Sequence, residues 1–405
     1  MNKTFRNSKD IEAFLPSVEL LERSRDIIEE AIGQIGRLTI ESILGMSAIE
    51  VAGTPERGKK GEDVYHYGSQ SGNVKVGGKR IQVERPRLRS KDGKEVKVPA
   101  YEILKEDPKS GQRALERVLK GVSAREYQGV FDEASKELGL SKSQISREFV
   151  EASEKALKEL MNRQITSRQL AIMIDGIHVG SSVVLVAIGI DALGSKSILG
   201  IQEGASENSS AVGCLLSSVI GKGVNPEEGI LFILDGAKAL SKAVNEFFPY
   251  AQIQRCRVHK MRNVLEHLPE SKRSYIKAKM NLAYRLSYQE ALAKLQDLAK
   301  ELEVNHPGAA ASLREGLEQT LTVSKLAVSP LLVHSLSTTN LIESSFSRAR
   351  SRMRKVTNFT SGQMVLRWCA SALVLAEQNF RSIKGVKDLW MLKSALDNQL
   401  EIASN

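Results

Sequence analysis

The sequence predicts an α/β protein built on a mixed sheet of five strands. Five short apolar runs have the length of buried strands, and they cover residues 171–174, 183–190, 197–202, 230–234 and 252–256. The first three runs are close enough to form a meander. Helical patterns over 209–220 and 238–248 separate the third run from the fourth and the fourth from the fifth. This order predicts a sheet with antiparallel and parallel pairs, covered by helices.

The same order of elements matches a ribonuclease-H-like core. In that core the first and fourth strands are neighbours, so acidic residues on them face one another. Asp175 ends the first predicted strand and Asp235 ends the fourth, and each is followed by glycine. The sequence therefore predicts that two carboxylates meet at the sheet.

A third acid, Glu343, lies near the start of a predicted helix in STTNLIESSFSRARSRMRK. Three converging carboxylates suit Mg²⁺ or Mn²⁺, and two such ions can clamp the attacking and leaving oxygens of a phosphodiester. Each acid also has a purely structural alternative. Asp-Gly is a hairpin signal, an aspartate before a helix can be its N-cap, and Asn340 with Glu343 fits a capping box.

The spacing of the acids predicts a folded insertion. Asp235 follows Asp175 by 60 residues, but Glu343 follows Asp235 by 108, more than a strand-to-helix crossover needs. Helical patterns fill this gap over residues 271–286, 287–302 and 307–321. The second begins with the capping box Ser287-Tyr-Gln-Glu290. We expect an all-helical insertion that interrupts the sheet domain.

Composition limits the class of protein. The chain has 405 residues, 41% of them hydrophobic, which is enough for a large core and two to four domains. A net charge of +10 fits a nucleic-acid-binding protein, although basicity is also common among proteins that bind none. Three cysteines form no disulfide framework, and neither a signal peptide nor a membrane-spanning run is recognised. We expect a cytoplasmic protein without a membrane partner.

The domain prediction divides the chain into six segments. An N-terminal helical region covers 1–70, a basic β-hairpin module 71–105 and a helix-turn-helix-like region 106–160. The ribonuclease-H-like domain covers 165–265 and 335–385, the helical insertion 266–334 and a C-terminal tail 386–405. Between Lys75 and Arg125 there are 15 Lys or Arg against 7 Asp or Glu. The hairpin module is therefore suited to contact a phosphate backbone, or it is a solvated surface ribbon.

The helix-turn-helix prediction rests on a helix over 124–138, a turn at Gly139 and a short helix opened by Ser141 and running through Phe149. In such a motif the second helix enters the major groove. It would present Lys142, Gln144 and Arg147 to DNA. Two ordinary helices joined by Leu-Gly-Leu produce the same pattern.

The predicted helix after Glu343 is strongly basic, with no acid among its five cations, Arg348, Arg350, Arg352, Arg354 and Lys355. Residues four apart share a helix face, so these cations form two rows. Such a concentration of like charge favours contact with phosphates over a solvated surface. Trp368 and Trp390 on the following helices are expected in the core.

Cys256 and His259 form a Cys-x-x-His pair just after the fifth strand. As a zinc site the pair is incomplete, since four ligands are expected and only His267 lies nearby. A structural role is therefore favoured. His178 is three residues past Asp175 and either faces the same site or lies on the other strand face, which we prefer.

Three blocks resemble the DDE transposases of bacterial insertion sequences related to the eukaryotic Mutator elements. LDGAKALSKAVNEFFPYAQIQRCRVHKMRNVLEHLP resembles the second-aspartate block, TTNLIESSFSRARSRMRK the glutamate block, and MIDGIHVG the first-aspartate block. The resemblance covers about residues 165–385 and, more loosely, the N-terminal half. It implies that Asp175, Asp235 and Glu343 are catalytic and that Cys256 and His259 lie near them.

The resemblance implies a transposase that cuts and joins double-stranded DNA at the terminal inverted repeats of its own element and at a target. Two Mg²⁺ ions, replaceable by Mn²⁺, would be held by the three acids. Because two ends must be cut together, a homodimer or larger synaptic assembly is expected. Two alternatives stay open: a catalytically idle DNA-binding regulator, and a metal-dependent nuclease that does not join strands.

Overall fold

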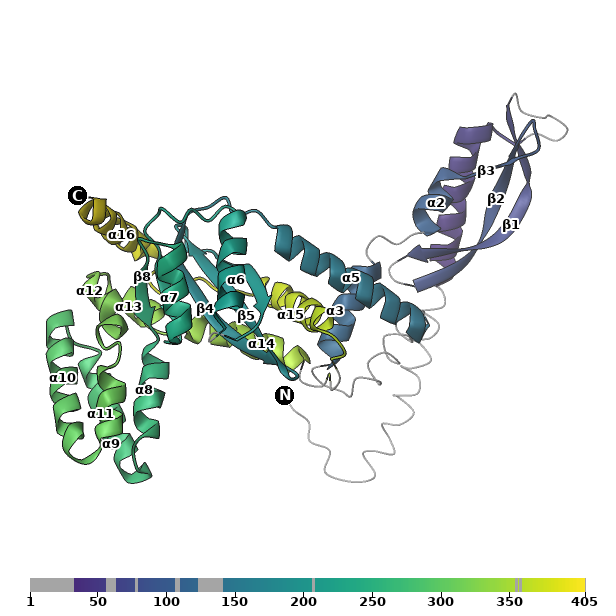
Figure 1. Ribbon diagram of the computed structural model, residues 1–405. Helices are drawn as coiled ribbons and strands as arrows, with labels where there is room; N and C mark the ends of the chain where they lie inside the picture. Colours follow the sequence, from purple (N-terminus) through teal and green to yellow (C-terminus); the bar gives the residue numbers. More distant parts are fainter. Residues whose placement is uncertain are drawn as a thin grey trace, which may run out of the picture. The chain divides into compact units, whose positions relative to one another are not determined.

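The computed structural model describes residues 33–55, 63–76, 79–105, 110–122, 141–205, 208–353, 356 and 359–404. They belong to two compact units, Met1–Arg113 with Asp132–Ile145, and Ala114–Phe131 with Ser146–Asn405. The five-stranded sheet predicted from the sequence lies in the second unit (Figure 1). Within the described ranges, no helix has the length and apolar character needed to span a membrane.

The first unit contains a small antiparallel sheet and a helix over residues 33–52. The strands are β1 (Val64–Val76), β2 (Lys79–Ser90) and β3 (Glu95–Val96), in that order, and α2 (Pro99–Lys105) follows them. Val74 and Val83 from the sheet share one core with Leu44 from the helix. The basic β-hairpin expected from the sequence is thus present, although β1 begins before the expected boundary at residue 71.

The second helix of the expected helix-turn-helix is longer than predicted. Its start agrees with the prediction, since the Gln144 amide donates a hydrogen bond to Ser141 Oγ at 3.2 Å. Instead of ending near Phe149, α5 (Lys142–Asn162) continues to Asn162 and is 21 residues long. Phe149, Ser153 and Leu160 continue one buried face, and no breaking residue interrupts it. The expected first helix and Gly139 lie outside the described residues; α3 (Ser110–Val122) precedes them.

The central sheet has the mixed topology predicted from the sequence. Its strands are β4 (Gln169–Val179), β5 (Ser182–Asp191), β6 (Lys196–Glu203), β7 (Leu231–Leu234) and β8 (Gln252–Arg255). Their order is β6-β5-β4-β7-β8, so the first and fourth strands of this domain are neighbours. The meander β4-β5-β6 is antiparallel, whereas β4, β7 and β8 run parallel.

Helices cover both faces of the sheet (Figure 1). On one face, α6 (Ser209–Gly221) and α7 (Lys238–Phe247) pack on Ile172 and Ile174 of β4 and on Phe232 and Leu234 of β7. On the other, α14 (Asn340–Met353) contacts β4, and α15 (Gly362–Glu377) contacts β5 and β6. Since strand side chains alternate, the odd-numbered residues of β4 and β7 face α14.

A helical insertion separates β8 from α14, as predicted. Its elements are α8 (Arg257–Glu266), α9 (Glu270–Ala283), α10 (Tyr288–Asn305), α11 (Pro307–Arg314), the 3₁₀ turn η1 (Glu318–Leu321), α12 (Thr322–Lys325) and α13 (Pro330–Leu336). The capping box of Ser287 and Glu290 is confirmed at the start of α10. The single helix expected over 307–321 is wrong, because the chain turns at Gly316, whose φ is +61°.

The two tryptophans differ in their surroundings. Trp368 on α15 is 2% exposed and packs on Phe149, with ring centroids 4.6 Å apart, as expected for a core residue. Trp390 is 68% exposed, so the prediction that it lies in the core is wrong. It stands at the start of α16 (Leu389–Ser404), after the 3₁₀ turn η2 (Val386–Asp388), where Leu389 and Leu392 occupy the buried side instead.

Candidate active site

The register of the two central parallel strands brings Asp175 and Asp235 to neighbouring positions. Ile174 of β4 pairs with Leu234 of β7, and each is followed directly by its aspartate. Both aspartates have odd numbers, and the odd-numbered residues of these two strands have their side chains on the face toward α14. The sheet therefore presents two carboxylates side by side to the same helix.

The hairpin alternative for Asp175 is wrong. Asp175 is not the last residue of its strand, because β4 continues to Val179 and turns only between Val179 and Ser182. Its Oδ1 accepts a hydrogen bond of 2.8 Å from the amide of Gly176. A side chain held within a strand, rather than at a turn, has a direction that the whole sheet determines.

The capping alternative for Asp235 is also wrong. The N-cap of α7 is Ala237, which makes no side-chain capping bond, while Asp235 Oδ1 accepts from the Ala237 amide at 2.9 Å. Gly236 between them has a φ of +105°, and a Cβ there would lie 2.2 Å from Nε of Arg255. The glycine thus allows the chain to leave β7 sharply beside Arg255.

Glu343 lies in the first turn of α14 and is partly buried. The capping box expected with Asn340 is wrong, since Asn340 is already the first residue of the helix. Instead, Glu343 Oε1 accepts a hydrogen bond of 3.1 Å from the hydroxyl of Thr339. A side chain outside the helix thus orients this carboxylate.

Thr339 links the glutamate to the Cys-x-x-His pair, a connection the sequence did not reveal. Its hydroxyl lies 3.3 Å from Sγ of Cys256 and 3.5 Å from Nδ1 of His259, and its amide lies 3.4 Å from the same sulfur. His259 Nε2 is 3.9 Å from Glu343 Oε1. The pair therefore lies beside Glu343, as the family resemblance implied. Thr339, 80 positions after His259 in the sequence, connects them.

Burial, hydrogen bonds and neighbouring charges shift the pKa values of Asp175, His259 and Cys256. Burial raises the pKa of Asp175 to about 6; the Gly176 amide and the charge of His259 oppose this rise, and the Asp235 and Glu343 carboxylates add to it. A hydrogen bond with Cys256 raises the pKa of His259. Burial tends to raise the pKa of Cys256, but hydrogen bonds from His259 and Thr339 outweigh it and lower that pKa. The three carboxylates are thus close enough to repel one another.

His178 belongs to the other side of the sheet. It is exposed and three residues from Asp175, and an odd separation along a strand puts two side chains on opposite faces. This agrees with the preferred alternative in the sequence analysis. His178 is therefore not a neighbour of the acids.

The predicted DNA-contacting residues have different surroundings. On α14, Arg348 donates to the Asn379 carbonyl at 3.0 Å, Arg350 lies over the Phe346 ring at 5.6 Å, and Arg352 is partly buried. Arg354 and Lys355 lie outside the described residues. On α5, Lys142 and Arg147 are exposed and Gln144 is partly buried.

The remaining polar residues of QRCRVHK anchor the helical insertion, which sequence reasoning missed. Lys260 is fully buried, and its Nζ donates to the carbonyls of Ser312 and Glu315 at 2.6 and 2.5 Å. Arg257 donates to the Thr320 carbonyl and the Ser324 hydroxyl, both at 2.8 Å. Only tertiary contacts distinguish these buried cations from DNA-binding ones.

The chemistry of the three acids suits a divalent ion. Carboxylate oxygens are the ligands that Mg²⁺ prefers, and Asp175 is a partly buried carboxylate whose charge is opposed by two others, which a cation would relieve. Among the described residues, no three Asp, Glu, His or Cys side chains are grouped tightly enough to hold an ion. The type of ligand therefore fits Mg²⁺, while in this conformation the described carboxylates are too far apart to hold one ion together.

Fold and site together define an α/β protein with two acids on neighbouring central strands of a mixed sheet and a third on the helix that packs against them. The family model for "Transposase, Mutator family" matches residues 11–382. The chain therefore belongs to the Mutator family of transposases.

Similar proteins are transposases of bacterial insertion sequences. The transposase for ISRM5 of Rhizobium meliloti (strain 1021) is 28% identical over 273 residues, which cover 65% of this chain and 67% of that protein. The transposase for IS905 of Lactococcus lactis subsp. lactis (strain IL1403) is 23% identical over 310 residues, or 74% and 76% of the two chains. The transposase for IS6120 of Mycolicibacterium smegmatis is 29% identical over 247 residues, or 58% and 74%.

Proposed function

We propose that this Mutator-family transposase binds the ends of its insertion sequence and catalyses DNA cleavage and strand transfer in a ribonuclease-H-like domain. Asp175, Asp235 and Glu343 would hold two Mg²⁺ ions, with Mn²⁺ as a substitute. The supporting observation is the parallel register of β4 and β7, which ends in two neighbouring aspartates beneath the helix that carries Glu343.

The side chains of the site have distinct tasks in this proposal. Asp175 and Asp235 supply carboxylates from the rigid sheet, and Thr339 orients the carboxylate of Glu343. When bound, the ions activate a water or a 3′-hydroxyl for attack and stabilise the departing 3′ oxygen. Both hydrolysis and strand transfer are in-line displacements at phosphorus, so one set of acids serves both without a covalent protein–DNA intermediate.

We infer that residues other than the three acids also contact DNA. The proposed contacts are the basic β1–β2 hairpin, the arginines of α14, and Lys142, Gln144 and Arg147 of α5. Arg348 and Arg352 lie on the helix that carries Glu343, and like charges with no acid on their row favour an anionic partner. Two copies of the chain or more would be needed to hold two element ends.

One incubation distinguishes this function from its alternatives. The protein is mixed with Mn²⁺, a plasmid target and labelled duplexes that carry the element ends, identified as inverted repeats in the DNA flanking the reading frame. Joined products support the transposase, nicks without joining support a nuclease, and retarded but intact DNA supports a regulator. The last two outcomes contradict the proposal.

We expect Asp175→Asn to stabilise the metal-free protein. Because the folded-state pKa of Asp175 is raised to about 6, the wild-type protein loses stability as the pH rises from about 4 to about 6 and keeps this deficit above it. Removing the charge should restore about 2 kcal/mol and raise Tm by about 4–8 °C at pH 8 in EDTA. Thermal unfolding with and without Mg²⁺ measures this effect.

The matched control is Asp191→Asn, at the end of β5. Asp191 Oδ1 accepts hydrogen bonds from the amides of Leu193 and Ser195, so its charge is stabilised and its removal should not raise Tm. Mg²⁺ should raise Tm of the wild type more than that of Asp175→Asn. Equal Mg²⁺ effects on both proteins would exclude Asp175 as a ligand.

Thr339→Val should slow DNA cleavage by about 10–100-fold, because the carboxylate of Glu343 loses the hydroxyl that orients it. Its Mg²⁺ requirement should rise, whereas the affinity for DNA should not change. Thr339→Ser keeps the hydroxyl and should recover most of the rate. A Val variant with wild-type rate and Mg²⁺ dependence would show that Thr339 does not position the glutamate.

A further inference from the structure

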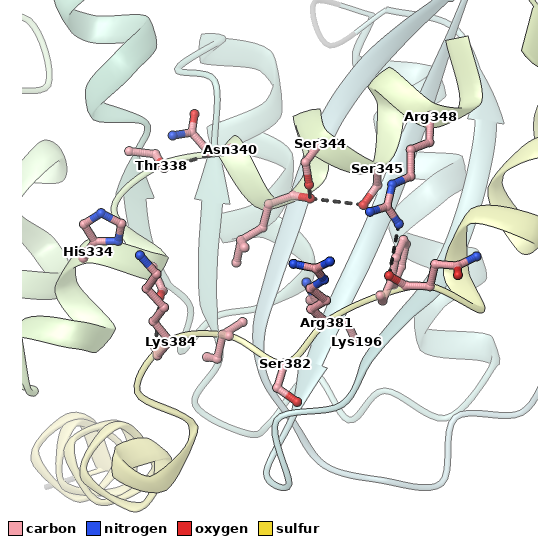
Figure 2. A pocket seen from close by; sticks show the side chains of 15 residues that line it. Lys196, His334, Thr338, Asn340, Ser344, Ser345, Arg348, Arg381, Ser382 and Lys384 are labelled. Carbon is pink, nitrogen blue, oxygen red and sulfur yellow. Dashed lines mark hydrogen bonds between the residues drawn. The ribbon is translucent and has the colours of Figure 1, made fainter. Parts of the chain in front are cut away.

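A basic cavity of about 270 Å³ lies next to α14, on a face of that helix other than the one bearing Glu343. Asn340, Ser344 and Arg348, spaced four apart along α14, form one wall. Lys196 of β6, His334 at the end of α13, and the segment after α15 with Arg381 and Lys384 contribute to the other walls. Figure 2 shows Arg348 and Arg381 reaching into the same space from opposite sides.

Among the described residues, no carboxylate balances the charge of this cavity. Its lining contains the four cations Lys196, Arg348, Arg381 and Lys384 and no Asp or Glu. None of the four pairs with a carboxylate in the part of the chain that the structure describes; Arg348 donates to the Asn379 carbonyl, and Lys196 lies 5.5 Å from the Phe380 ring centroid. Burial and the charge of Arg348 lower the pKa of Lys196. An anion would relieve this repulsion.

The site is built for an anion with several oxygens. Two guanidinium groups and two ammonium groups offer donors from three directions, and neutral side chains such as Thr338 and Ser344 complete the lining. A second cavity of about 590 Å³ shares His334, Thr338 and Asn340 with the first and includes Tyr284 and Tyr288. A ligand that continues beyond one anionic group would therefore meet a second, partly aromatic space.

We propose that the basic cavity binds a backbone phosphate of the DNA strand whose phosphodiester is processed at Asp175, Asp235 and Glu343. The inference rests on the proposed function, since it assigns the cavity to the same substrate. Ser344 in the cavity wall directly follows Glu343, so a strand held there runs within one helix diameter, about 10 Å, of Glu343. The cavity would thus hold the strand in position for cleavage.

The first test uses the full-length protein and the salt dependence of its binding to a labelled duplex carrying one element end, in Ca²⁺ to prevent cleavage. Arg381→Ala/Lys384→Ala removes two exposed cations from the cavity. The slope of log K against log[KCl] should become less steep by about 0.9, the loss of one phosphate contact. The control Lys387→Ala/Lys393→Ala removes two exposed lysines that do not line the cavity and should keep the wild-type slope. Equal slopes in all three proteins, or equal losses in both variants, would overturn the proposal.

The second test locates the phosphate. Duplexes with one uncharged methylphosphonate at successive positions are bound to wild type and to the cavity variant. A methylphosphonate at one position near the cleavage site should weaken binding by the wild type. The same methylphosphonate should have little further effect on the cavity variant, because the variant has already lost that contact. Arg381→Lys/Lys384→Arg keeps both charges and should keep the wild-type salt slope. Additive losses at every position would overturn the assignment, as would competition by inorganic phosphate alone with no strand position dependence.

These tests separate the two proposals. Binding slopes and methylphosphonate effects are measured without catalysis, so they report on the cavity even if the protein neither cuts nor joins DNA. Conversely, the wild type could cleave DNA in Mg²⁺ while the cavity variant keeps the wild-type salt slope. This pair of results would support the proposed function and reject the phosphate site.

Discussion

Asp235→Ala should abolish both end cleavage and strand transfer in Mg²⁺, with a rate at least about 1,000-fold below wild type, or about 4 kcal/mol of lost transition-state stabilisation. Asp235 supplies one of the two neighbouring carboxylates that directly follow the pair of Ile174 in β4 and Leu234 in β7. Binding to the element ends should survive, because the proposed DNA contacts lie on other side chains. Gel assays of labelled ends with a plasmid target measure cleavage, joining and binding together.

The control for Asp235→Ala is Asp297→Ala. Asp297 is an acid of α10 whose side chain is 67% exposed, and it pairs with Lys300 on the same helix. Its replacement should leave cleavage and joining within about twofold of wild type. An Asp235→Ala protein that still joins DNA would remove this residue, and with it the proposed metal site, from the mechanism.

Lys260→Met should destabilise the protein by about 2–4 kcal/mol. The side chain is fully buried and donates to two carbonyls of the α11 end, Ser312 and Glu315, while its charge lies 3.8 Å from the Glu315 carboxylate. Burial and the nearby Arg255 lower the pKa of Lys260 to about 8. Methionine fills the space but leaves both carbonyls without this donor. Chemical denaturation measures the loss.

The matched substitution is Lys277→Met on α9, where the lysine is exposed. It should change the free energy of unfolding by less than about 0.5 kcal/mol. If Lys260 contacted DNA instead, its replacement would weaken DNA binding without lowering stability. That result would contradict the structural role assigned to the cations of QRCRVHK.

The arrangement of the sheet was predictable because its signals are local. Apolar runs of strand length, a meander and two intervening helices leave few topologies, and β6-β5-β4-β7-β8 is the one found. The ends of the elements were less accurate. β4 extends four residues beyond Asp175 because β5 pairs with it to Val179, and such a partner is not visible in the run itself.

The sequence by itself determined the family and the order of the strands, and it predicts the three acids, since each of these signals is carried by contiguous residues. Tertiary structure decided what surrounds the acids. Thr339 meets Cys256 and Glu343, and Lys196 meets Arg348 and Arg381, only after strands and helices from distant parts of the chain pack together. The physical reason is that burial and repulsion between charges depend on distance in space. A motif records which cations are present, but only packing decides whether a cation anchors a helix, as Lys260 does, or lines an open cavity, as Arg381 does.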